Sequence, residues 1–317
     1  MKVIYWNMKN KLLIAAFCCF LKSYGQKTEK VFLDKNDPSH ECYTAILPDK
    51  SPVVGYLVLI PGFGETAERV MEQTDLPLRC AEKGILTIIP TLTDGVMSFG
   101  VDDSSQKSLT AIIEDASKKF DLAARQFYIG GFSIGGSAAV KYAEIALSGN
   151  FKNKPAAIFA IDPPLDFERF YNSAQRDLRL SAGSQPNQEN VYMVGRIEQV
   201  MGGTPVAALK NYHAISPYSY SDTEQKAIKS LINIPIRLYS EPDVNWWIEN
   251  RNADFSAMNV LDGSAMVNEL RRLGNRQAEL ILTENKGYRK PDNKRHPHSW
   301  SIADSEGLIS WLLGNKG

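Results

Sequence analysis

Ser133 has the sequence context of a serine that can act as a nucleophile. Residues 130–136 read Gly-Gly-Phe-Ser-Ile-Gly-Gly and contain the pattern Gly-x-Ser-x-Gly. A serine hydroxyl is a weak nucleophile at neutral pH unless a base removes its proton, and histidine is the side chain with a suitable pKa. With such a base, and with N–H groups placed to stabilise an oxyanion, the serine would attack an acyl carbonyl.

Four histidines are candidates for this base. His40 lies in a region patterned as edge strands, and His213 lies in a segment without strand patterning. His296 and His298 follow the last predicted strand, and His298-Ser299-Trp300 leads into the closing helix. We predict that His298 is the base, with His296 as the alternative. The two histidines could also ligate a metal, but no cysteine or acidic cluster accompanies them, so we predict no metal site and no cofactor.

The elements around Ser133 follow from the residues on either side. β-Branched and aromatic residues at 126–129 predict a short strand, and apolar residues at 139, 142, 143 and 146 have helical spacing. Ser133 therefore lies on the turn between them, where glycines permit a sharp reversal of the chain. The N-terminus of the helix brings unpaired N–H groups to the same place, and that of Ile134 is one of them.

This strand, turn and helix resemble the nucleophile elbow of the α/β-hydrolase superfamily, with Gly131, Ser133 and Gly135 at the motif positions. The resemblance implies an α/β fold with a mostly parallel central sheet flanked by helices. Residues 121–136 look particularly like secreted serine esterases of the polyhydroxybutyrate-depolymerase and feruloyl-esterase type.

The resemblance also implies an oxyanion hole. The loop after the third strand of the superfamily supplies one backbone donor, and residues 61–66 occupy that place here. By position, the N–H groups of Phe63 and Ile134 are the two donors. Pro61 stands where the superfamily often has histidine.

A carboxylate must hold the histidine in the right tautomer and stabilise its charged form. The superfamily usually places this acid after the strand predicted at 234–240, where Glu241 and Asp243 lie. Asp243 matches the motif position better, so the predicted acid is Asp243. Glu241 is an alternative, and Asp162, after the preceding strand, is a second location known in the superfamily.

The rest of the chain alternates between strand and helix patterns, which indicates a parallel sheet. Strand patterning disappears between 165 and 230, where three short helices are expected. We interpret 165–230 as a helical lid inserted between two parts of one hydrolase core, 26–164 and 231–317. The strands predicted to be buried or half-buried lie at 53–60, 85–90, 126–129, 156–161, 234–240 and 280–283.

Residues 1–25 read as a secretory signal peptide, with lysines before an apolar run and small residues before a cleavage site near Gly25. The ten apolar residues 12–21 are too few to cross a bilayer, so we expect no stable membrane anchor and a secreted or periplasmic protein. Cleavage removes four lysines and no acids, which leaves four more acidic than basic residues and gives no reason to expect nucleic acid.

Two cysteines, Cys42 and Cys80, remain after cleavage. In an oxidising compartment a disulfide between them would persist. The sequence leaves open whether they pair or stay as two buried thiols.

The residues together predict a serine hydrolase that acts on a carboxylic ester of a small molecule or a polymer. A serine peptidase is the first alternative, because the same three side chains attack esters and amides. A binding protein that keeps the fold without catalysis is the second. The sequence does not indicate the oligomeric state.

Overall fold

The computed structural model describes residues 27–34, 41–48, 52–181 and 188–315. The predicted signal peptide and His40 lie outside these residues. In the described ranges, no helix combines the length and apolarity needed to span a membrane.

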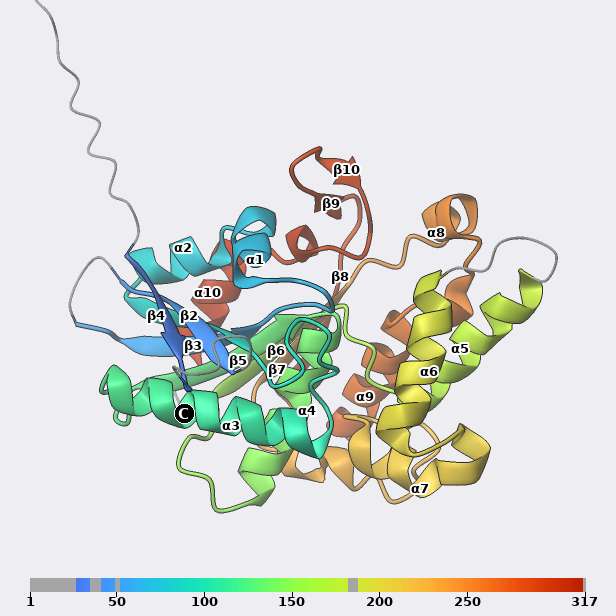
Figure 1. Ribbon diagram of the computed structural model, residues 1–317, viewed down its shortest axis with the longest axis horizontal. Coiled ribbons are helices and arrows are strands. Elements are labelled where there is room, and N and C mark those ends of the chain that lie inside the picture. Colours follow the sequence, from blue (N-terminus) through green and yellow to red (C-terminus); the bar gives the residue numbers. More distant parts are fainter. Residues whose placement is uncertain (1–26, 35–40, 49–51, 182–187, 316–317) are drawn as a thin grey trace, which may run out of the picture.

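An eight-stranded sheet forms the centre of the molecule (Figure 1), in the order β1-β2-β4-β3-β5-β6-β7-β8. The strands from β4 to β8 in this order run parallel, and β1 and β2 add an antiparallel edge. The bounds are β1 Thr28–Phe32, β2 Cys42–Ile46, β3 Gly55–Ile60, β4 Ile85–Thr91, β5 Gln126–Phe132, β6 Ala157–Ile161, β7 Ile236–Ser240 and β8 Ala278–Leu282.

Helices cover both faces of the sheet, so β3 is buried on both sides (Figure 1). Tyr56 and Val58 pack in a core with residues of α3, α4 and α9, whereas Leu57 and Leu59 pack with residues of α1, α2 and α10. This alternation is the two-residue period of a strand. The helices are α1 Ala67–Gln73, α2 Leu76–Glu82, α3 Asp103–Lys119, α4 Ile134–Ser148, α9 Val260–Arg272 and α10 Ser305–Gly314.

Between β6 and β7 the described chain is helical, and Figure 1 shows this part beside the sheet. Its side chains form a third core with Phe99, Val101 and Ile134, so it packs against the start of α4. That this helical segment acts as a lid over the site stays a prediction. The elements are α5 Phe167–Leu180, α6 Gln188–Met201, α7 Pro205–Ile215 and the short η1 Ala227–Leu231, and after β7 and β8 come α8 Val244–Arg251, η2 Phe255–Ala257, β9 Tyr288–Arg289, β10 Lys294–Arg295 and η3 Trp300–Ile302.

Cys42 and Cys80 are both buried free thiols in the structure, so they do not form a disulfide with each other. Burial raises the pKa of the Cys80 thiol to about 12. The thiol therefore stays protonated and packs as a small apolar side chain.

Glycines after β5 let the chain pass close to the end of β3. A Cβ atom at Gly135 would lie 2.2 Å from the carbonyl oxygen of Pro61 and 2.3 Å from that of Ile60. At Gly131 it would lie 2.5 Å from the carbonyl carbon of Gly135. These neighbours are backbone atoms, so no side-chain rotation relieves the contact, and both positions require glycine.

Gly135→Ala is expected to lower the free energy of unfolding by about 3 kcal/mol or more, because the added methyl group overlaps two carbonyl oxygens. Gly195→Ala is the matched control. Gly195 is exposed in α6, with no atom within 4 Å of an added Cβ, and alanine there should stabilise by about 0.5 to 1 kcal/mol. Urea unfolding followed by circular dichroism measures both changes. Equal stability of Gly135→Ala and the unchanged protein would contradict the close approach.

Candidate active site

Ser133 occupies a strained backbone position between β5 and α4. Its φ and ψ angles are 53° and −126°, a region that residues with a Cβ rarely adopt. The backbone N–H of Ser133 donates to the carbonyl oxygen of Ile161 at 2.8 Å, which ties the turn to the end of β6. The side-chain hydroxyl makes no hydrogen bond to any described residue, so it is available to a substrate and to a base.

His298 lies beside this turn with its ring oriented by a carboxylate. Its Nδ1 lies 2.6 Å from Oδ2 of Asp162, and its ring packs on Phe132 with centroids 4.5 Å apart. Nε2 of His298 has no hydrogen-bond partner among the described residues. A carboxylate at Nδ1 fixes the tautomer that leaves Nε2 as the proton acceptor.

Hydrogen bonds hold both the backbone and the side chain of Asp162 at the end of β6. Its backbone has a positive φ of 47°, and its N–H donates to the carbonyl oxygen of Tyr239 at 2.8 Å. The hydroxyl of Ser240 donates to Oδ1 of Asp162 at 2.7 Å, so Oδ2 remains for His298. The carboxylate therefore cannot turn away from the imidazole without breaking two hydrogen bonds.

The prediction of Asp243 as the partner of His298 is therefore wrong in geometry, because Asp162 occupies that place. Asp243 caps α8 by accepting the N–H of Trp246 at 3.1 Å and forms an ion pair of 2.7 Å with Arg295. Arg295 lies in β10 and draws Asp243 away from the histidine.

Glu241, the alternative acid after β7, is also occupied elsewhere. Its carboxylate is buried, forms an ion pair of 2.7 Å with Arg295, and accepts the backbone N–H groups of Lys286 and Gly287 at 2.9 and 3.1 Å. Its role is to hold the loop after β8. Asp162, at the second location considered in the sequence, is the carboxylate that lies against His298.

His296 does not contact an acidic side chain in the described structure. Its Nε2 lies 3.2 Å from Nη2 of Arg251, and its ring packs against Trp246 and Trp247. Burial, together with the charge of Arg289, lowers the pKa of His296 to about 2, so the ring is neutral at ordinary pH. Of the two histidines, only His298 is arranged as a base. Among the described residues, no group of three or more His, Cys, Asp or Glu side chains is arranged to hold a metal ion.

Glu65 fixes the conformation of the predicted oxyanion loop, residues 61–66. Its Oε2 accepts the backbone N–H of Gly62 at 2.9 Å and the indole N–H of Trp300 at 3.0 Å. The N–H of Gly64 donates to the carbonyl oxygen of Val96 at 2.8 Å. The N–H of Phe63 between them donates to no described residue, so it is left for an oxyanion.

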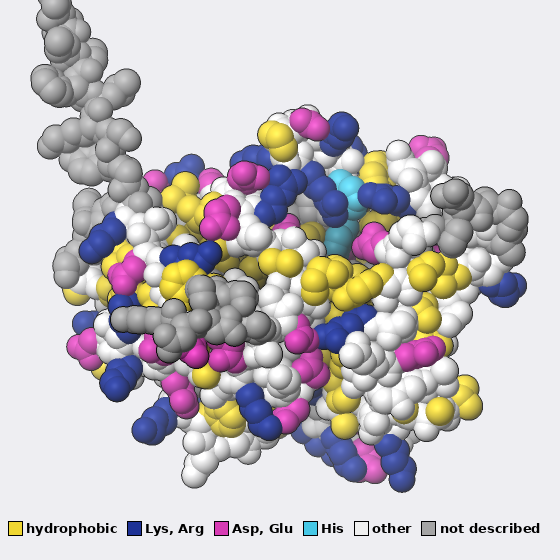
Figure 2. Space-filling view, viewed as in Figure 1, with side chains coloured by type: hydrophobic (Ala, Val, Ile, Leu, Met, Phe, Trp, Pro, Cys, Tyr) yellow, Lys and Arg dark blue, Asp and Glu magenta, His cyan; other side chains and the backbone are white. Residues whose placement is uncertain are grey.

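A cavity of about 400 Å³ brings these groups together. Ser133, His298 and Asp162 line it with Phe63 and Ile134, whereas Asp243 does not. Figure 2 shows the histidine side chains in a recess of the molecular surface.

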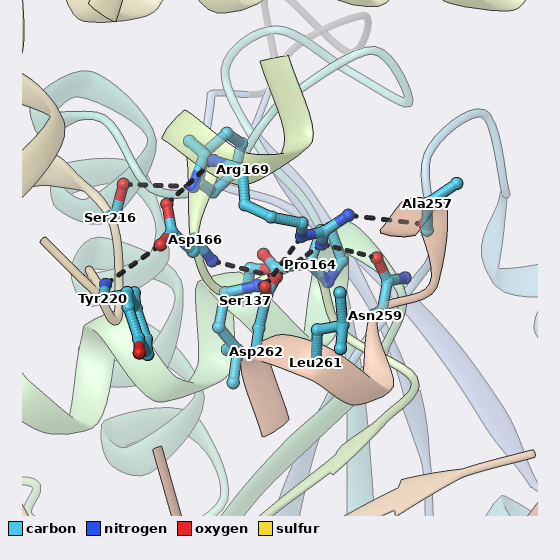
Figure 3. A network of polar contacts seen from close by, with 12 residues as sticks. Ser137, Pro164, Asp166, Arg169, Ser216, Tyr220, Ala257, Asn259, Leu261 and Asp262 are labelled. Atoms are coloured by element: carbon cyan, nitrogen blue, oxygen red, sulfur yellow. Dashed lines mark hydrogen bonds and ion pairs between the residues drawn. The ribbon is translucent and has the colours of Figure 1, made fainter. Parts of the chain in front are cut away.

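A buried ion pair supports the chain that follows β6 (Figure 3). Asp262 of α9 accepts from Nε of Arg169 at 2.7 Å and from the backbone N–H of Leu165 at 3.0 Å. Arg169 of α5 donates to the side chain of Asn259 at 3.1 Å, and Asn259 donates to the carbonyl oxygen of Asp162 at 2.9 Å. The helical segment and α9 therefore fix the backbone of the carboxylate on His298.

Sequence reasoning missed three residues that shape this site. Arg295 and Asn259 act on residues distant in sequence and lie outside the recognised motifs, whereas Glu65 lies in the recognised loop 61–66 but contacts the distant Trp300. Local patterning carried no signal for them, since a single arginine, glutamate or asparagine in a loop is common.

No protein-family model and no curated protein matches this chain. Solved structures do resemble it. An acylaminoacyl peptidase from Pyrococcus horikoshii aligns with a TM-score of 0.60 and 12% identity over 93% of this chain and 42% of that one. MPT51 (FbpC1) from Mycobacterium tuberculosis has a TM-score of 0.59 and 14% identity over 92% of this chain and 99% of that one. Carboxyl esterase 2 from Tuber melanosporum has a TM-score of 0.57 and 14% identity, over 92% and 84%.

These structures show the fold. The chain has the α/β-hydrolase fold predicted from its sequence, with a mostly parallel central sheet flanked by helices. It spans about two fifths of the length of the Pyrococcus peptidase.

The neutral state of His296 predicts a loss of stability in acid. The pKa of His296 in the folded protein is far below its ordinary value of 6.5, so the unfolded chain binds the proton first. The stability that the neutral ring of His296 contributes is therefore complete above about pH 6.5. Below that pH, the free energy of unfolding falls by up to about 1.4 kcal/mol per pH unit.

His296→Phe keeps an aromatic ring against Trp246 and Trp247 and removes the titrating group. The free energy of unfolding, measured in urea across this pH range, should fall less steeply for the variant than for the unchanged protein. His213→Phe, at the end of α7, is the control for loss of a histidine elsewhere. Parallel pH curves for His296→Phe and the unchanged protein would refute the assignment.

Proposed function

We propose that this protein is a serine hydrolase that cleaves carboxylic esters. The observation that carries the proposal is one cavity that contains a strained Ser133, the His298–Asp162 pair and two backbone N–H groups. Separately, each feature has structural explanations. Their convergence supplies each group that acyl transfer needs.

The proposed reaction begins with proton transfer from the Ser133 hydroxyl to Nε2 of His298 as the oxygen attacks the acyl carbonyl carbon. The carbonyl oxygen becomes negative and is stabilised by the N–H groups of Phe63 and Ile134. The proton on His298 then passes to the leaving alcohol, which departs and leaves an acyl-enzyme. Water, deprotonated by His298, attacks the acyl group. His298 then returns that proton to the oxygen of Ser133 as the bond between this oxygen and the acyl carbon breaks, which releases the acid and restores the serine.

The carboxylate of Asp162 stabilises the imidazolium that forms on His298. The hydrogen bonds that it accepts from Ser240 and from Nδ1 of His298 suit that role, because both favour a carboxylate in a fixed orientation. Asp162 replaces Asp243 in the triad proposed from the sequence.

An ester is the proposed substrate, although the peptidase reading shares every step. A carboxyl esterase and an acylaminoacyl peptidase both appear among the similar folds. The two reactions differ in the leaving group, which is an alcohol for an ester and an amine for a peptide. We also propose that segment 165–230 acts as a lid and that cleavage near Gly25 directs the protein to the periplasm or the exterior. Sequencing the N-terminus of the exported protein tests the second point, and an intact residue 1 would refute it.

A fluorophosphonate probe tests the proposal directly. The purified protein should form a covalent adduct on Ser133, located by peptide mass spectrometry, because only an activated serine reacts with this probe. Ser133→Ala should form none. Turnover of acyl esters and of peptides by the labelling-competent protein then separates esterase from peptidase. A folded protein that forms no adduct would favour the non-catalytic binding protein.

Two aspartate variants test the identity of the acid. Asp162→Asn should lower kcat by about 1,000-fold or more, because the amide no longer stabilises the imidazolium or fixes its tautomer. Asp243→Asn removes only a partly exposed ion pair with Arg295 and should change kcat by less than about tenfold. Steady-state kinetics with one ester, and thermal unfolding as a check on folding, compare the two. The reverse order of effects would restore Asp243 as the acid.

A further inference from the structure

Three arginines contribute to the wall of the active-site cavity. Arg69 of α1, Arg251 at the end of α8 and Arg289 of β9 line the cavity that contains Ser133 and His298. The same three arginines line an adjoining cavity of about 430 Å³. Figure 2 shows Lys and Arg side chains gathered around the histidines on this face.

Two of these arginines lack a carboxylate partner among the described residues. Arg289 donates from Nε and Nη2 to the backbone carbonyl oxygen of His298 at 3.2 and 2.9 Å. Arg251 contacts Nε2 of neutral His296. Arg295 nearby is different, since both Glu241 and Asp243 neutralise it. Neither the Arg251 nor the Arg289 guanidinium group is therefore neutralised by an ion pair with a described residue.

Five carboxylates also line the cavity, those of Glu65, Asp162, Asp177, Glu189 and Glu241. Asp162 is bound to His298, Glu65 and Glu241 accept N–H groups of the surrounding loops, and Asp177 accepts the side-chain amide of Asn190 at 3.3 Å. Burial lowers the pKa of the Arg289 guanidinium, the charge of Arg251 lowers it further, and the carboxylates of Glu65 and Glu189 offset only part of this. An anion beside Arg289 would stabilise its charged form.

The loop that carries Arg289 is held against α1 by hydrogen bonds. The side-chain amide of Gln73 exchanges two hydrogen bonds with the backbone of Lys290, at 2.7 and 3.1 Å. Arg69 donates to the same carbonyl oxygen at 3.1 Å. These contacts fasten the β9–β10 hairpin to α1. A guanidinium fork held in place binds the oxygens of a carboxylate, sulfate or phosphate in a two-point contact.

We propose that the substrate carries an oxyanion group, which Arg251 and Arg289 bind while the acyl carbonyl lies at Ser133. The inference rests on the proposed hydrolase function and names its substrate class. Arg251 and Arg289 would select anionic esters over neutral esters of the same shape, whereas Arg69 is already paired with Glu72 at 2.9 Å. Attraction of this kind weakens as salt screens it.

Matched ester pairs test the preference. In one pair the charge lies on the leaving group, as the butyrate ester of 4-hydroxybenzoate against that of 4-hydroxybenzamide. In the other it lies on the acyl chain, as mono-4-nitrophenyl adipate against 4-nitrophenyl heptanoate. For at least one pair we expect kcat/KM to favour the anionic ester by about tenfold, which corresponds to one charged hydrogen bond.

Arginine variants assign the preference to the site. Arg251→Gln should remove most of the anionic preference, and Arg251→Lys should keep part of it because the charge remains. Arg272→Gln is the matched control, since Arg272 is an exposed arginine of α9 outside both cavities. It should keep the full preference. Equal preference in Arg251→Gln and the unchanged protein would overturn the proposal.

A binding measurement separates this inference from the proposed function. Calorimetric titration with benzoate, sulfate and inorganic phosphate detects the anion site without any turnover. Esters cleaved with no charge preference would leave the hydrolase standing and overturn the anion site. Anion binding that Arg251→Gln weakens, with no ester or peptide cleaved, would support the anion site and refute the hydrolase. Neither binding nor turnover would overturn both.

Discussion

The site depends on the close contact between the turn after β5 and the end of β3. Gly131 and Gly135 bring the backbone of the turn against the carbonyl groups of Ile60 and Pro61, at distances that exclude a Cβ atom. This contact forces Ser133 into a positive φ, a strain of about 1–3 kcal/mol that the surrounding structure must offset. Parallel pairing of β5 with β3 and β6 supplies that support, and the oxyanion loop begins where the same contact ends.

The carboxylate on His298 comes from the end of β6 because of what surrounds each strand end. β6 lies beside β5 in the sheet and β7 lies one strand farther away, so both ends can face the same cavity. Asp162 has a positive φ and a hydrogen bond from Ser240 that directs its free oxygen toward the imidazole. At the end of β7, Arg295 binds Glu241 and Asp243 together. Because Arg295 pairs with both Glu241 and Asp243, Asp162 is the acid that remains for His298.

Local sequence was sufficient for most of the fold and, in the candidate site, for placing Ser133 and His298 in one cavity, but not for the carboxylate beside the histidine. The strand before Ser133, the helix after it and the buried strands of the parallel sheet all follow from short-range patterns, and the structure confirms this α/β architecture. The choice of Asp243 failed because it depended on Arg295, 52 residues away. Glu65 and Trp300, which hold the oxyanion loop, are 235 residues apart. Contacts of this range leave no periodic signal in a single sequence.

The charged groups around the cavity lie in two places, at the strand ends of the sheet and in the loops at its periphery. Groups proposed for the reaction lie at strand ends, where backbone pairing fixes them and where Asp162 is the carboxylate next to His298. The peripheral loops neutralise the other nearby acids, Glu65 through N–H donors and Glu241 through Arg295. Once those acids are occupied, Arg251 and Arg289 are left with exposed positive potential toward the cavity. A low-dielectric recess strengthens that potential, so in the proposed enzyme the loops would set the charge of the substrate and the sheet would set the geometry of the reaction.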